Sequence, residues 1–167
     1  ALFNPRMDVH TVIQHTDFEN LDIMPSNIDL SAAEVQLVTE VGREQVLAGV
    51  LRQVKDEYDV IIVDCQPSLG LLTVNALTAA DGVIIPVAAE FFALRGVALL
   101  MQSIEKVQSR INPSLEVYGV LVTMFTHTLH CDEVLQRIYE AFQGKVFHSV
   151  ISRSRSEEHT SELQSHL

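Results

Sequence analysis

The sequence has no tryptophan, and its 167 residues include only two cysteines, Cys65 and Cys131. Two cysteines are too few for the disulfide framework of a small secreted protein, and they indicate a reducing compartment. Basic residues are also scarce: 11 lysines and arginines face 22 aspartates and glutamates, for a formal net charge of −11. This balance argues against a protein that coats nucleic acid constitutively, although it leaves room for a local basic patch.

Targeting signals are absent as well. No apolar run reaches the roughly 18 residues that a membrane span requires. The first residues lack the basic and then apolar pattern of a signal peptide, and because there is no initiator methionine we expect the natural start to lie upstream. A hydrophobic content of 47% excludes a disordered chain, and the length suits one domain.

Residues 155–167 differ from the rest of the chain. Their sequence, which starts at Arg155-Ser156-Glu157-Glu158, reads as the in-frame translation of a common sequencing adapter. The stretch is polar and has no hydrophobic period, so we expect it to be disordered and exclude it from the functional interpretation. A natural disordered tail is the alternative.

The preceding residues alternate β-branched runs with amphipathic stretches. We expect strands at 21–24, 60–64, 82–86, 117–123 and 146–151, and helices at 43–57, 71–80, 94–109 and 132–142. Ser31 and Glu34 have capping-box spacing for an earlier helix, with Ser26 as a competing start. Such alternation predicts an α/β fold with a mostly parallel sheet and helices on both faces. Ligands of such sheets lie beyond the carboxyl ends of the strands.

The strongest local signal is Val60-Ile61-Ile62-Val63-Asp64. Its apolar residues predict a strand buried on both faces, with a carboxylate at the carboxyl end. In phosphate-handling sheets such a carboxylate holds Mg²⁺, usually through water; the alternative is a helix N-cap. Gly70, at the end of the next loop, allows a close approach to phosphate or a change of loop conformation, or makes an ordinary tight turn.

The stretch from Tyr58 to Leu77 resembles the Walker B and switch II segment of ParA-type partition ATPases, the deviant-Walker P-loop proteins of the ParA/MinD group. Residues 21–30, 79–87, 90–94 and 119–125 resemble further segments of that family, and the resemblance covers nearly all of residues 1–154. It implies a three-layer P-loop NTPase-like fold that is incomplete here. Residues 1–154 are then a partial ParA-like ATPase domain.

The resemblance also implies roles for individual residues. Asp64 would organise Mg²⁺ through water, and Gln66, Pro67 and Gly70 would belong to the loop that senses the γ-phosphate of ATP. Gln66 stands where relatives usually have a second proline. No G-x-x-x-x-G-K phosphate loop occurs in the chain, so we expect that loop upstream and expect this chain alone to be inactive.

The function implied by the resemblance is ATP-dependent DNA segregation. An ATP-bound homodimer would bind DNA non-specifically, in the cytoplasm on the nucleoid, and a ParB-like centromere-binding protein would stimulate hydrolysis. Two alternatives stay open: a MinD-like ATPase that cycles on a membrane, and a non-catalytic scaffold of the same fold.

Weaker patterns have competing interpretations. His127, His130 and Cys131 suggest a metal site, but zinc needs a fourth ligand that the spacing does not offer, and a polar loop before a helix explains them better. Ser68 is not set in the G-x-S-x-G motif that places the nucleophile of a hydrolase. Cys65 is a redox candidate only if its thiol is activated. The scattered basic residues are a candidate DNA patch or ordinary solvated surface: Lys106, Arg110, Arg137 and Lys145.

Overall fold

The computed structural model describes residues 7–66, 70–90 and 93–153. The chain divides into two compact units. One consists of residues 1–81 together with 104–115, and the other of residues 82–103 together with those from 116 onward. Each unit is described separately below.

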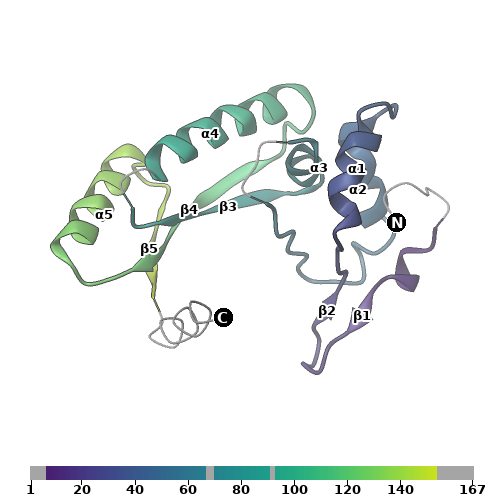
Figure 1. Ribbon diagram of the computed structural model, residues 1–167, viewed down its shortest axis with the longest axis horizontal. Helices are drawn as coiled ribbons and strands as arrows, with labels where there is room; N and C mark the ends of the chain where they lie inside the picture. The colour runs from purple at the N-terminus through teal and green to yellow at the C-terminus, as the bar shows by residue number, and fades with distance from the viewer. Residues whose placement is uncertain (1–6, 67–69, 91–92, 154–167) are drawn as a thin grey trace, which may run out of the picture. The chain divides into compact units, whose positions relative to one another are not determined.

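A parallel sheet forms the centre of the second unit. Its strands are β3 (Gly82–Ala88), β4 (Glu116–Phe125) and β5 (Val146–Ser152), which pair in that order, all parallel (Figure 1). The helix α4 (Ala93–Arg110) lies between β3 and β4 in the chain, and α5 (Leu129–Ala141) lies between β4 and β5. Parallel neighbours need such crossovers, so the expected α/β class and mostly parallel sheet are confirmed.

Part of the apolar surface of these elements is buried. Ile85, Val87, Val120 and Val122 are buried on β3 and β4, and Val134 and Ile138 on α5. On α4, Val97, Ile104 and Val107 are buried, and Leu100 and Met101 are half-buried.

Gly119 marks the closest approach of two strands. The Val120 N–H donates to the Lys145 carbonyl at 2.7 Å, which brings the start of β5 against β4. A Cβ atom on Gly119 would lie 2.9 Å from that carbonyl oxygen and 2.9 Å from the Phe147 ring. Gly119 also has a φ of +157°, which L-residues rarely adopt. The pairing here therefore depends on a residue without a side chain.

The first unit combines short helices with a small hairpin. The helices are α1 (Asp29–Leu37), α2 (Val46–Leu51) and α3 (Leu71–Ala79), with 3₁₀ turns at Val9–Thr11 and Arg43–Gln45. The strand predicted at 21–24 exists as β2 (Asp22–Ile23), but it pairs antiparallel with β1 (Gln14–His15). Among the described residues, no helix is both long enough and apolar enough to cross a bilayer.

The middle of α3 is attached to the rest of this unit through Asn75, whose side chain is only 3% exposed. Its Nδ2 donates to the carbonyls of Arg43 at 2.7 Å and Leu71 at 3.0 Å, and its Oδ1 accepts from the Leu47 N–H at 3.1 Å. A buried amide is tolerated because its polar atoms find partners.

The end of α3 is satisfied by a second asparagine. The last carbonyls of a helix have no partner within the helix. Nδ2 of Asn112 lies 3.1 Å from the Leu77 carbonyl, 3.3 Å from that of Thr78 and 2.9 Å from that of Ala80. One side chain thus places its amide N–H groups among several carbonyls at this terminus.

The strand predicted at Val60–Asp64 is wrong. The segment is extended, but none of the described residues pairs with it as a strand. Its four apolar side chains are exposed, at 73% for Val60, 38% for Ile61, 87% for Ile62 and 37% for Val63. An apolar run can favour a strand, but a strand forms only where a neighbouring backbone supplies hydrogen bonds.

Two helix predictions also need correction. The helix expected at 43–57 is confined to Val46–Leu51, because the chain beyond it closes i+3 turns such as Val54 N–H to the Leu51 carbonyl at 3.0 Å. The helix α1 begins at Asp29 with Ile28 at its N-cap position, so Ser26 lies before its start and Ser31 lies inside it. Oδ1 of Asn27 accepts from the Asp29 N–H at 3.1 Å.

We predict that Asn75→Ala destabilises the protein by about 2–4 kcal/mol, because it leaves the Leu47 N–H and the Arg43 carbonyl without their partner. Urea denaturation followed by circular dichroism measures the change. Gln102→Ala, which removes an exposed amide on α4, is the matched control and should change stability by less than about 0.5 kcal/mol. Equal stability of the two variants would contradict this account of Asn75.

We predict that Gly119→Ala costs about 1–3 kcal/mol, since the new methyl group must displace the β5 backbone. Gly96→Ala is the control, because Gly96 lies in α4 and a Cβ atom added to it would meet no atom within 4 Å. That change should be neutral or stabilise by about 0.5–1 kcal/mol. Thermal unfolding of both variants is the measurement, and a stable Gly119→Ala protein would refute the close approach.

Candidate functional site

Asp64 ends the extended segment and is exposed, as are its neighbours Cys65 and Gln66. A solvated carboxylate fits the oxygen chemistry of Mg²⁺. The chain holds no glycine-rich lysine loop that could enclose phosphates, so the residues present fit the metal but not the triphosphate.

The predicted phosphate-sensing loop, Gln66–Gly70, is described at its two ends. Gln66 is exposed and Gly70 is half-buried at the N-cap position of α3. Pro67, which shares the predicted role, and Ser68, the weak nucleophile candidate, lie outside the described residues. The structure therefore places Asp64 and Gly70 on either side of a short connection that leads into α3.

Glu34 also contacts this region, although its spacing from Ser31 predicted that it would help to cap its own helix. Its Oε1 accepts the Leu71 N–H at 2.7 Å, so it caps α3, a helix that lies 37 residues further along the chain. A Cβ atom on Gly70 would collide with the same Oε1 and lie 2.9 Å from Cδ of Glu34. The spacing of Ser31 and Glu34 indicated a cap, but for the wrong helix.

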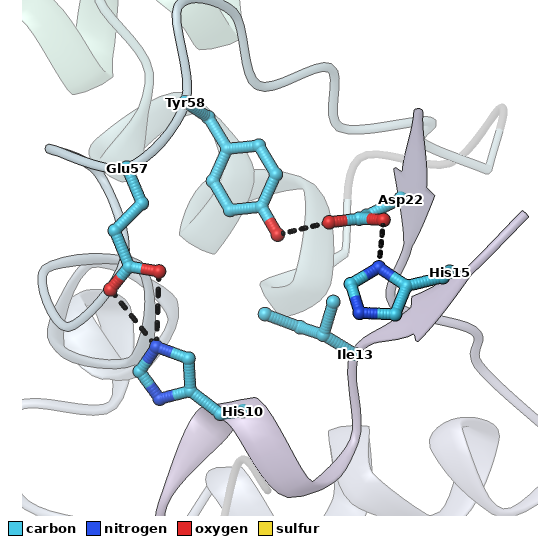
Figure 2. A pocket seen from close by; sticks show the side chains of 6 residues that line it. All are labelled: His10, Ile13, His15, Asp22, Glu57 and Tyr58. Atoms are coloured by element: carbon cyan, nitrogen blue, oxygen red, sulfur yellow. Dashed lines mark hydrogen bonds and ion pairs between the residues drawn. The ribbon is translucent and has the colours of Figure 1, made fainter. Parts of the chain in front are cut away.

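A separate polar pocket lies in the first unit, lined by His10, Ile13, His15, Asp22, Glu57 and Tyr58 (Figure 2). Asp22 is its central acceptor. His15 Nδ1 lies 2.6 Å from Asp22 Oδ1, and the Tyr58 hydroxyl donates to Oδ2 at 2.7 Å. These bonds, first that of His15 and then that of Tyr58, lower the pKa of Asp22, while the bond to Asp22 raises the pKa of Tyr58.

His10 on the other side of this pocket bridges two carboxylates. Nδ1 lies 2.7 Å from Asp8 Oδ1 and Nε2 lies 2.9 Å from Glu57 Oε1. Hydrogen bonds to Asp8 and then to Glu57 raise the pKa of His10, so its charged form persists to higher pH. These groups satisfy one another on the surface, where exposed ion pairs contribute little.

The alternative metal site at the start of α5 receives no support. Cys131 is buried, with Sγ 3.1 Å from Thr126 Oγ1, and the Cys131 N–H donates to Thr128 Oγ1 at 3.3 Å. His127 is exposed and stacks edge-on against Phe125 at 5.2 Å between ring centroids. Within the described ranges, no group of three or more His, Cys, Asp or Glu residues is arranged to hold a metal ion.

The redox alternative at Cys65 is also weakened. Desolvation by surrounding atoms, followed by the Asp64 charge, raises the pKa of the Cys65 thiol. A reactive cysteine needs the opposite shift. The candidate DNA-binding residues are all exposed, with Lys106 and Arg110 in one unit and Arg137 and Lys145 in the other.

Comparison with known proteins gives the family. Residues 1–117 match the family described as AAA domain. The chain is 44% identical over 147 residues to the chromosome-partitioning ATPase Soj of Treponema pallidum, which covers 87% of this chain and 58% of that protein. It is 40% identical over 155 residues to the chromosome partitioning protein ParA of Myxococcus xanthus, covering 92% of this chain and 54% of that one. The chain thus spans about half the length of the curated relatives it matches.

Solved structures agree on the fold. A plasmid partition protein from Borrelia burgdorferi, 25% identical, superposes with a TM-score of 0.74 over 95% of this chain and 64% of that one. Cobyrinic acid a,c-diamide synthase from Mycobacterium smegmatis, with bound ADP and magnesium, is 36% identical to this chain. It superposes with a TM-score of 0.83 over 96% of this chain and 68% of that one. With the family match and the partitioning relatives taken together, this chain belongs to the ParA-type partition ATPases of the AAA domain family.

Proposed function

We propose that the complete protein is an ATP-dependent DNA partition ATPase, and that residues 1–154 are part of its ATPase domain. The observation that carries the proposal is 40–44% identity, over 87–92% of this chain, to a chromosome-partitioning ATPase Soj and a chromosome partitioning protein ParA. The bound ADP and magnesium of a 36% identical solved structure support ATP and Mg²⁺ as its cofactors.

In this proposal Asp64 organises Mg²⁺ through a water molecule, and Gln66, Pro67 and Gly70 belong to the loop that responds to the γ-phosphate. Mg²⁺ supplies charge stabilisation during phosphoryl transfer. The exposed position of Asp64 supports the assignment because its carboxylate oxygens are free of burial and open to a hard cation.

The exposed apolar residues Val60–Val63 support placing this segment inside a larger sheet. Four consecutive apolar side chains at 37–87% exposure are unfavourable in water. A further strand of the complete protein would cover them and supply backbone hydrogen bonds. Asp64 would then project from the edge of that sheet beside the phosphates.

We propose further that the ATP-bound protein is a homodimer that binds DNA non-specifically on the nucleoid, in the cytoplasm, and that a ParB-like protein stimulates its hydrolysis. The exposed residues Lys106, Arg110, Arg137 and Lys145 are the candidate DNA contacts. The net charge of −11 favours weak, salt-sensitive and nucleotide-gated contact.

We predict that Asp64→Asn in the complete protein lowers Mg²⁺-dependent ATP turnover on the order of 100-fold, because the amide keeps the shape but loses the charge that orders metal-bound water. Phosphate release measures the effect. Asp59→Asn, at an exposed position before the same segment, is the matched control and should retain turnover within about twofold. Full activity of Asp64→Asn would refute its assignment.

We predict that the complete protein sediments with non-specific duplex DNA when ATP is bound and not when ADP is bound. Raising the salt from about 50 to about 200 mM should weaken this binding at least tenfold. Sedimentation with anionic lipid vesicles in place of DNA would favour the MinD-like alternative. Absence of ATP turnover together with absence of both kinds of binding would favour the scaffold.

A further inference from the structure

The side chain of Glu34 joins two elements that are distant in sequence. Glu34 lies on α1 beside Ala33, which is 3% exposed, and one turn before Leu37, which is fully buried. The burial of Ala33 and Leu37 fixes which face of α1 is covered. From there the half-buried carboxylate of Glu34 reaches the start of α3, where Oε1 accepts the Leu71 N–H at 2.7 Å.

The N-cap residue of α3 supplies no side-chain cap. Its N-cap residue is Gly70, which has no side chain, and its first turn contains no acidic residue. The first N–H groups of a helix lack internal partners and carry a partial positive charge. A carboxylate supplied from another helix satisfies one of them with a charge-assisted hydrogen bond.

Gly70 provides an independent sign of the same contact. Its φ of −75° is open to any residue, so backbone conformation does not require glycine here. A Cβ atom would collide with the Glu34 carboxylate, which is the flexible end of its side chain, so a larger residue at position 70 would push that carboxylate away from the start of α3. Glu34 therefore touches the last residue of the Gln66–Gly70 loop as well as the first residue of α3.

We propose that Glu34 is a positioning residue that holds the end of the phosphate-sensing loop in place by capping α3 against Gly70. It acts through Gly70 and Leu71 and does not itself contact the nucleotide. This inference rests on the proposed function of the loop. It predicts that loss of Glu34 impairs the response to bound ATP more than the binding of ATP.

The test uses the complete protein and two variants. Glu34→Ala removes the cap and should lower kcat for Mg·ATP about tenfold, with KM changed less than about twofold, since misplacement at a distance affects the transition state. Glu34→Gln keeps an acceptor oxygen of the same reach and should restore most of kcat. Glu40→Ala, at an exposed glutamate just after α1, is the control and should match the unaltered protein.

Amide hydrogen exchange supplies a readout that does not depend on activity. In Glu34→Ala, the amides at the start of α3 should exchange at least about tenfold faster than in the unaltered protein, while those around Val134 on α5 keep their rate. Gly70→Ala should produce the same local change by displacing the carboxylate. Combined with Glu34→Ala it should add little, because both variants break one contact.

The outcomes separate the two proposals. Unchanged kcat and unchanged exchange in Glu34→Ala, with turnover lost in Asp64→Asn, would overturn the role of Glu34 and leave the proposed function standing. An equal loss of kcat in Glu34→Gln and Glu34→Ala, with the melting temperature lowered equally in both, would reduce Glu34 to a structural residue. Absence of Mg²⁺-dependent turnover in the unaltered protein would overturn both proposals.

Discussion

The backbone groups of α3 need partners that this short helix does not supply itself, and much of the first unit is arranged to provide them. Glu34 accepts from its first N–H, Asn75 links its middle to the chain around Arg43 and Leu47, and Asn112 donates to its last carbonyls. Partners for the backbone of α3 come from α1 and from the chain after α4, while Asn75 of α3 itself satisfies the Arg43 carbonyl and the Leu47 N–H. A nine-residue helix is marginal alone, so these contacts decide where it lies.

This anchoring connects the fold to the function. The loop that resembles the nucleotide switch of partition ATPases ends at Gly70, which is also where α3 begins. The hydrogen bond that Glu34 accepts fixes the start of α3 where this loop ends, and a Cβ atom on Gly70 would meet the same carboxylate.

Sequence periodicity predicted the elements whose stability depends on neighbouring apolar surface. The strands β3, β4 and β5 and the helix α4 were found because apolar residues recur in the sequence at the period of a strand or a helix. The segment Val60–Asp64 has the same composition, but composition says nothing about whether a neighbouring backbone is present to pair with it. The contact between Glu34 and Leu71 was missed because it joins residues 37 positions apart.

The sequence by itself determined the class of fold, the family and the candidate roles of Asp64, Gln66, Pro67 and Gly70, because these depend on local order and on the periods of single elements. Only the tertiary structure decided that Val60–Val63 is unpaired among the described residues, that Glu34 caps α3 and not its own helix, and that a side chain at Gly119 would meet the backbone of Lys145. The physical reason is that hydrogen bonds and close packing between distant segments are set by how the backbone folds in three dimensions.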